Sequence, residues 1–176
     1  MFLRSQLSWN VVVPAENLDA EGLILQKAIL IRLLDEFSAK KASKDIGYFL
    51  AVTTLDHIGK GIVRQHTGDL LFPVDFSCIT FKMFPGEILE GVVHKILKHG
   101  VFVKCGPAEK VYISHLKMAD YQYVPGENPC FRNEKSPKIE KGTVVRFLVL
   151  AEKYDEAEKD FRAVVSLEGD FLGPIN

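Results

Sequence analysis

Cysteine and histidine are the side chains of this 176-residue sequence that could bind a metal ion or attack a substrate. The three cysteines, Cys78, Cys105 and Cys130, are far apart and form no C-x-x-C pair, which favours free thiols over a zinc site or a disulfide framework. The five histidines show no H-x-x-x-H spacing. We therefore predict no metal site and no cofactor, and a reducing compartment.

The sequence also lacks the motifs expected for catalysis by a nucleophile or by a pair of carboxylates. The sequence has no G-x-S-x-G elbow, and its acidic run from Glu152 to Asp160 includes Lys153 and Lys159, as in a solvated hairpin. The glycines of residues 58–61 (Ile-Gly-Lys-Gly) do not continue into a phosphate-binding motif and instead indicate a tight exposed tip. We expect a protein that is not an enzyme.

The remaining chemistry is the binding of single-stranded nucleic acid through aromatic rings. Tyr112 has aliphatic neighbours of the opposite strand parity, so its ring is predicted to point outward. Phe102 has the same pattern, and either points outward or belongs to the core. Positive or hydrogen-bonding side chains close to them in sequence are Lys95, His99, Lys104, Lys110, Lys153 and Arg162. If these converged with the rings on one face, they would form a binding surface.

The charge balance limits how such a surface could work. The chain has 22 basic and 23 acidic residues, and its composition is that of a globular protein. A near-neutral chain does not hold duplex nucleic acid by bulk electrostatics, so a nucleic-acid role must rest on a local face. We predict no membrane association, because no apolar run reaches the roughly 18–20 residues that span a bilayer. The opening residues lack the order of a secretory signal.

The elements that would position these residues fall into two domains, residues 1–81 and 82–176. The first domain is predicted to be α+β. Its expected strands are residues 3–13, where apolar residues alternate up to Pro14, residues 46–55, which should be central because both faces are apolar, and residues 70–83.

A helix is predicted at about residues 17–40, with Asn17 or Asp19 as its N-cap. Its apolar residues are too many for one narrow stripe, so the helix should be buried on more than one side. The additional apolar surface either meets a partner chain or is covered by the rest of its own domain.

The second domain is predicted to be all-β. Five strands with a long connection between the third and the fourth are typical of an OB-type Greek-key barrel. A long loop is expected at residues 121–141, which contain three prolines, and a short tail at residues 167–176. The expected strands are residues 88–97, 101–105, 110–113, 143–152 and 161–167.

Two sets of motifs resemble known families. Residues 86–93, 99–103 and 111–114 resemble the OB-fold RNA-binding repeat of the large bacterial small-subunit ribosomal protein. Over the complete chain, a second set resembles the seventh-largest (stalk) subunit of eukaryotic nuclear RNA polymerases and its counterpart in the archaeal enzyme. The divergence from the polymerase II form resembles that of the plant paralogues in the silencing polymerases IV and V. The motifs of the second set are residues 1–2, 46–48, 51–56, 58–61, 71–74, 128–131 and 166–173.

The polymerase resemblance implies a non-catalytic subunit of a nuclear DNA-dependent RNA polymerase that supports initiation. Its first domain would be a truncated ribonucleoprotein-like α/β fold, and the second an OB-fold barrel. It would pair with the fourth-largest subunit, dock on the largest subunit of the core near the clamp, and bind the emerging single-stranded RNA. The alternative is a free-standing OB-fold RNA-binding module of translation or RNA decay, which would need residues 86–167 alone.

The resemblance also assigns site residues position by position. The RNA-binding face falls on His99, Phe102, Tyr112, Lys153 and Arg162, together with Lys104 beside them. His99 stands where the repeat has an aromatic residue, Tyr112 where it has a histidine, and Lys153 where it has an acid, and all three still permit stacking or phosphate contact. The docking tip falls on residues 57–63, with His57, Ile58, Gly59, Lys60, Gly61 and Ile62 as the contact residues.

Overall fold

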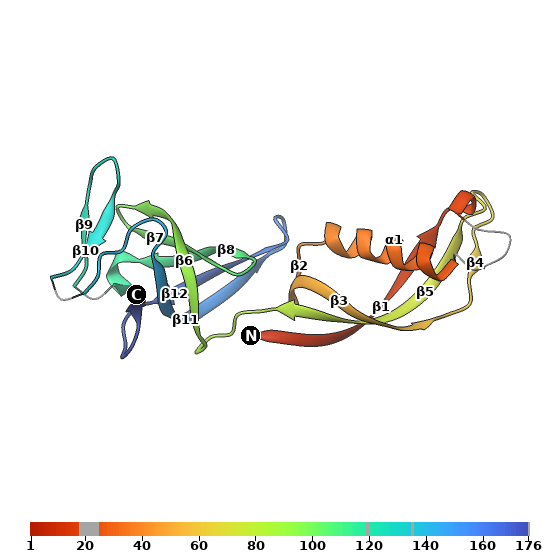
Figure 1. Cartoon of the computed structure of the whole chain (residues 1–176), viewed down its shortest axis with the longest axis horizontal. Helices are drawn as coiled ribbons and strands as arrows, with labels where there is room; N and C mark the ends of the chain where they lie inside the picture. Colours follow the sequence, from red (N-terminus) through yellow and green to blue (C-terminus); the bar gives the residue numbers. More distant parts are fainter. Residues whose placement is uncertain (18–24, 119, 135, 176) are drawn as a thin grey trace. The chain divides into compact units, whose positions relative to one another are not determined.

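A computed structural model describes residues 1–17, 25–118, 120–134 and 136–175 of the chain (Figure 1). The fold is mostly β-structure with one α-helix in the described part. It divides into two compact units, one formed by Phe2–Phe81 and the other by Met1 with the chain from Lys82 onward. Within the described ranges, no helix has the length and apolar character needed to cross a membrane.

The sheet of the first unit is centred on β5 (Leu70–Phe81). On one side β5 pairs antiparallel with β1 (Phe2–Val13), and on the other with β3 (Gly47–Ile58) and β4 (Ile62–Val63). The short strand β2 (Ala42–Ser43) pairs with the start of β3. The predicted first strand is confirmed, since the odd-numbered residues of β1 are the more buried ones.

The predicted strand at residues 46–55 is confirmed as β3, but the prediction that it is central is wrong for most of its length. Beyond Tyr48, β3 has a strand partner on one edge alone among the described residues. Its pairing with β5 is interrupted by three register shifts, and each shift adds one residue to β3. As a result, every third residue packs against the core and both parities are apolar. The core-facing residues are Phe49, Val52, Leu55 and Ile58.

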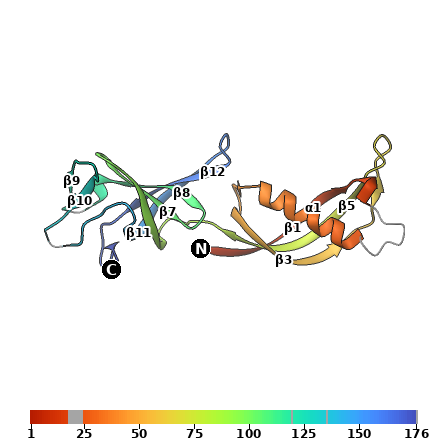
Figure 2. The same cartoon turned by 45° about the horizontal axis from the view of Figure 1, so that its top comes forward.

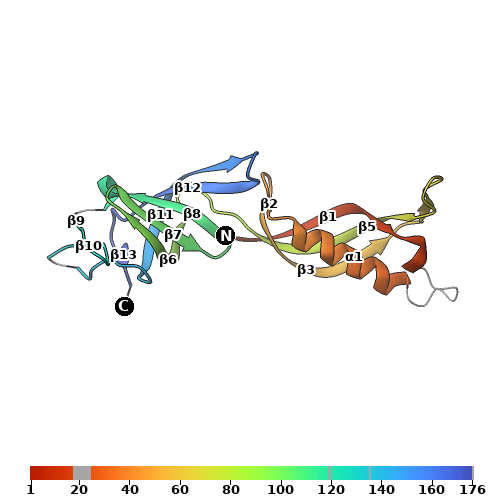
Figure 3. The ribbon, with the colours of Figure 1, turned by 90° about the horizontal axis from the view of Figure 1, so that it is seen from above.

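The helix α1 (Leu25–Ala39) lies across one face of this sheet (Figure 3). Its buried residues follow an i, i+4 spacing: Ile29, Leu33 and Phe37. Leu30, Ile31 and Leu34 are exposed, so the helix is not covered on a second side by its own domain. A short 3-10 helix, η1 (Ala15–Asn17), precedes it, and the predicted N-cap Asp19 lies outside the described residues.

Aromatic side chains form the centre of the core between helix and sheet. Trp9 of β1 contacts Phe76 of β5 with ring centroids 5.0 Å apart, and Phe37 of α1 contacts Phe49 of β3 at 5.2 Å. Trp9 also lies 5.9 Å from both Phe37 and Phe49. These four rings link the helix to all three long strands of the unit.

A closed five-stranded barrel of mixed strand direction forms the second unit, as the predicted OB-type barrel requires. The strand order is β12–β8–β7–β6–β11, and the pairing of β11 with β12 closes it. Every pair is antiparallel except β8 with β12, which is parallel. The strands are β6 (Ile88–Leu97), β7 (Gly100–Cys105), β8 (Ala108–Ser114), β11 (Val144–Asp155) and β12 (Asp160–Ser166).

The connection between β8 and β11 is more ordered than predicted. After the 3-10 helix η2 (His115–Lys117), a hairpin of β9 (Gln122–Val124) and β10 (Cys130–Arg132) occupies part of the expected loop (Figure 2). Buried Phe131 anchors it by bridging to Ile139. The expected tail also contains a strand, β13 (Gly173–Pro174), which pairs with β11.

Candidate nucleic-acid interface

Phe102 and Tyr112 form the centre of the candidate site. They are direct partners in the antiparallel pairing of β7 with β8, and their ring centroids lie 5.1 Å apart. Both side chains are half-buried and lie on the outer face of the barrel. Their neighbours along each strand point into the core and have no exposed surface: Val101, Val103, Val111 and Ile113. The outward alternative for Phe102 is therefore the correct one.

The turn before β7 fixes the Tyr112 ring. The hydroxyl of Tyr112 donates a hydrogen bond to the carbonyl oxygen of His99 at 2.8 Å. A Cβ atom at Gly100 would lie 2.8 Å from that hydroxyl and 2.1 Å from the carbonyl oxygen of Ile113, so a side chain at this position would collide with both. His99 thus contributes its backbone to the site, while its side chain is exposed.

A surface pocket of about 440 Å³ opens beside the two rings. One side of it comes from β12, because Val164 pairs with Tyr112 across the parallel β8–β12 contact. Val164 is 45% exposed and supplies an apolar surface next to the rings. The pocket can therefore accept the face of a planar aromatic group such as a nucleobase. Its lining residues are Phe102, Lys110, Tyr112, Glu158, Arg162, Ala163 and Val164.

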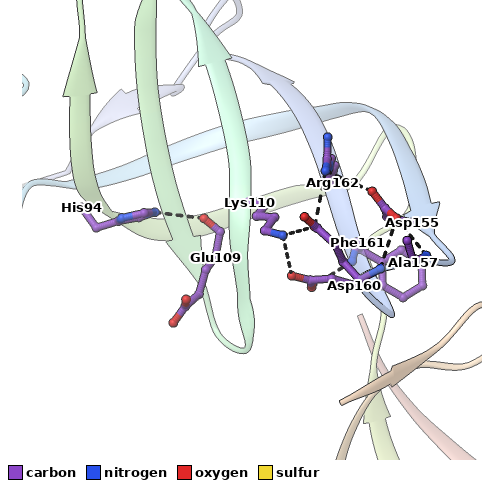
Figure 4. A network of polar contacts seen from close by, with 9 residues as sticks. His94, Glu109, Lys110, Asp155, Ala157, Asp160, Phe161 and Arg162 are labelled. Carbon is purple, nitrogen blue, oxygen red and sulfur yellow. Dashed lines mark hydrogen bonds and ion pairs between the residues drawn. The ribbon is translucent and has the colours of Figure 1, made fainter. Parts of the chain in front are cut away.

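Ion pairs surround this pocket (Figure 4). Arg162 contacts Asp155 at 3.0 Å and Glu158 at 3.4 Å. Lys110 binds the same oxygen of Glu158 and lies 3.4 Å from Asp160. Lys110, followed by Arg162, holds the pKa of Glu158 below its usual range, and the bond to Glu158 in turn raises the pKa of Lys110. The basic side chains do converge with the rings, but acids already neutralise them.

The other predicted RNA-binding residues lie outside the pocket. Lys153 stands opposite Arg162 in the β11–β12 pairing, is exposed, and has no ion-pair partner in the ranges that the structure describes. Lys104 follows Phe102 by two residues on β7 and pairs with Glu109 at 2.9 Å. Of the predicted residues, Phe102, Tyr112 and Arg162 therefore line the pocket together. Lys153 lies next to Arg162 on the neighbouring strand β11, and Lys104 lies further along β7.

Glu158, Val164 and His94 belong to this face and were not predicted. Glu158 supplies an acid on the β11–β12 hairpin, where the family resemblance assigned the acidic position to Lys153. Val164 follows Arg162 by two residues on one strand, so strand parity could have identified it. The ring of His94 lies 6.4 Å from that of Phe102, and its Nε2 is 2.9 Å from the Glu109 carbonyl oxygen. Only the pairing of β6 with β7 brings it there.

The predicted docking tip connects β3 to β4. Ile62 and Val63 of β4 are 62% and 59% exposed. Gly59 and Gly61 have no positive φ, so their role is close contact rather than an unusual backbone angle. A Cβ atom at Gly59 would lie 2.6 Å from the Pro73 side chain, and one at Gly61 would lie 2.6 Å from the Phe72 ring.

The cysteines have different surroundings. Cys78 and Cys105 are buried, and burial raises the pKa of Cys105 to about 11, so this thiol is not a nucleophile at neutral pH. Cys130 is half-exposed on β10. Among the described residues, no three His, Cys, Asp or Glu side chains come together as metal ligands.

Comparisons with known proteins identify the family. No family model matches the chain. The sequence is 60% identical to RNA polymerase V subunit 7 of Arabidopsis thaliana over 176 residues, which cover 100% of this chain and 99% of that protein. It is 53% identical to RNA polymerase IV subunit 7 of the same plant, over 99% of this chain and 100% of the other. Identity to Arabidopsis RNA polymerase II subunit 7 is 35%, over 82% of this chain and 86% of the relative. The predicted family is confirmed: this chain belongs to the subunit 7 family of DNA-directed RNA polymerases.

Proposed function

We propose that this chain is the non-catalytic stalk subunit of a nuclear RNA polymerase of the IV or V type, and that it acts in RNA-directed gene silencing. The observation that carries this proposal is the 60% identity to the polymerase V subunit along all 176 residues. The lower identity, 35%, to a polymerase II subunit supports the specialised assignment. A free-standing RNA-binding module is the weaker alternative, because the likeness to subunit 7 includes the first 81 residues, which such a module does not need.

The first unit would be the docking domain, with a truncated ribonucleoprotein-like fold. Its exposed tip residues Ile62 and Val63 would contact the largest subunit near the clamp. Leu30, Ile31 and Leu34 form an exposed apolar surface on α1, which favours burial against a second chain such as the fourth-largest subunit.

The barrel would bind the emerging single-stranded transcript. Bases would stack on Phe102 and Tyr112, and exposed Lys153 would contact a phosphate. The charge balance of this face supports weak binding. Weak binding is sufficient in an assembly that holds the transcript close by, because tethering replaces intrinsic affinity with local concentration. The subunit would also support transcription initiation from this position in the polymerase.

Affinity purification of the tagged full-length chain tests the proposal. We expect the largest subunit of polymerase IV or V and a fourth-largest-subunit homologue to co-purify, identified by mass spectrometry. Recovery of the polymerase II largest subunit in their place would keep the stalk role but contradict the IV/V assignment. Recovery of neither a polymerase core nor a fourth-subunit homologue would refute the proposal.

A further inference from the structure

We propose that Glu158 is a built-in competitor of nucleic-acid phosphate at the Phe102–Tyr112 face. Its carboxylate holds Lys110 and Arg162 beside the two rings and so weakens the binding of single-stranded RNA. The inference rests on the proposed RNA-binding function, which it deepens by identifying the residue that limits affinity.

The Glu158 carboxylate is held between two cationic side chains, as a bound anion would be. Lys110 and Arg162 come from β8 and β12 (Figure 4). Both contact the same atom, Oε2 of Glu158. All three residues line the pocket beside the rings. The side chains of Lys110, Arg162 and Glu158 are 37%, 57% and 45% exposed. A phosphate oxygen arriving from solvent could therefore take the position of that carboxylate oxygen.

The other two acids of the network, Asp155 and Asp160, accept hydrogen bonds from the backbone of the described residues, whereas Glu158 does not. Asp160 is 1% exposed and accepts a hydrogen bond from the backbone N–H of Phe161 at 2.9 Å. Asp155 accepts hydrogen bonds from the backbone N–H groups of Ala157 and Glu158 at 3.1 and 3.3 Å, which shapes the turn. The Glu158 carboxylate binds the two cations and no backbone group of the described residues. Its charge is thus dispensable for the hairpin.

Charge counting gives the expected effect. The formal charges of Lys110, Lys153 and Arg162 are balanced by those of Asp155, Glu158 and Asp160. Exposed ion pairs of this kind are weak, so a phosphate can displace the carboxylate, but the displacement lowers the net affinity. Cations already paired with acids also release fewer counterions on binding, which makes the salt dependence shallow.

The test compares Glu158→Gln with the wild type in fluorescence anisotropy, using the full-length chain and a labelled single-stranded RNA at several KCl concentrations. Glu90→Gln is the matched control, because it removes the same charge from an exposed ion pair with Arg146 on β6 and β11, away from the pocket. We expect Glu158→Gln to bind about fivefold more tightly at low salt. The slope of log K against log salt should steepen by about 0.7 for each freed cation.

The outcomes separate this inference from the proposed function. Equal affinity and slope in Glu158→Gln and Glu90→Gln would overturn the competitor role, and so would weaker binding by Glu158→Gln, which would make Glu158 a contact to the base. The Phe102→Ala/Tyr112→Ala variant is measured in the same series. If that variant bound RNA as well as the wild type, RNA binding at this face would itself be refuted.

Discussion

Leu33 and Leu34 are adjacent in α1 and have opposite surroundings. Leu33 has no exposed surface and packs in the aromatic core of the first unit, whereas Leu34 is 43% exposed. A substitution at Leu33 therefore tests the packing of the domain core. A substitution at Leu34 tests the exposed apolar surface that a partner could cover.

Leu33→Ala should lower the free energy of unfolding of the first unit by about 2–5 kcal/mol, because it leaves a cavity in the core. Leu34→Ala should change it by less than about 0.5 kcal/mol but weaken pairing with the fourth-largest subunit. Trp9 is the single tryptophan of the chain and lies in this core, so its fluorescence during urea unfolding reports the effect. Equal destabilisation by the two variants would contradict the packing of α1.

Replacement of Phe102 and Tyr112 by alanine should weaken single-stranded RNA binding while the barrel stays folded. Base stacking on an aromatic ring contributes about 1–3 kcal/mol per base, and neither side chain belongs to the buried core. Filter binding at moderate salt measures the loss. Tyr112→Phe is the control that keeps the ring and removes the hydrogen bond to His99. Unchanged affinity of the double variant would show that the rings are not the binding platform.

Gly61→Val should prevent incorporation into the polymerase while the dimer with the fourth-largest subunit still forms. The added side chain would collide with the Phe72 ring and displace the tip from β5. Co-purification of the core and of the partner measures the two effects separately. Lys60→Ala removes a predicted docking contact without such a collision, so comparing the two variants separates the loss of a contact from displacement of the tip. Normal incorporation of Gly61→Val would refute the docking assignment.

Asp56 should make the first unit sensitive to acid. Hydrogen bonds from Thr54 and then Ser77 hold the pKa of Asp56 below its ordinary value of 3.8. Since the pKa is lower in the folded state, the charged carboxylate stabilises the fold above the unfolded-state pKa. That stability is lost as the pH falls through the folded-state pKa. Asp56→Asn should reduce stability at neutral pH and flatten its decline in acid, as followed by Trp9 fluorescence. An equally steep decline in the variant would contradict this.

The three thiols should differ in reactivity towards Ellman's reagent. Cys130 is half-exposed and should react in the native protein, whereas Cys78 and Cys105 are buried, with pKa values raised by burial, and should react after unfolding. Cys130→Ser should therefore remove the fast phase observed by absorbance. Fast reaction of two or more native thiols would contradict the burial of Cys78 or Cys105.

Regular alternation made much of this fold predictable from sequence. In the first strand, and over most of each barrel strand, one parity faces the core, with one register shift in each of the pairings β6–β7, β7–β8 and β11–β12. Glycine marks the turns before and after β7. β3 failed that rule because its register shifts turn every third residue inward, from Phe49 to Ile58. The β9–β10 hairpin was missed because its strands have three residues each and lie among turn-forming residues.

The candidate site was predictable in part for a related reason. Parity identifies the outward position of Tyr112, because it depends on neighbours in one strand. The contact of Lys110 with Glu158 joins residues 48 positions apart and exists only because β8 pairs with β12. No local pattern encodes that register. The charges near the rings were therefore visible in the sequence, but their mutual neutralisation was not.

The parallel pairing of β8 with β12 also sets an order of events in folding. This pairing joins Val111 to Ala163, so the two sides of the pocket are about fifty residues apart in the chain. Formation of the pocket therefore requires closing a loop of that length, which costs conformational entropy. Such long-range closure is slow compared with hairpin formation. A growing chain therefore carries both aromatic rings long before it carries a pocket, and the pocket forms only when the last barrel strand has left the ribosome.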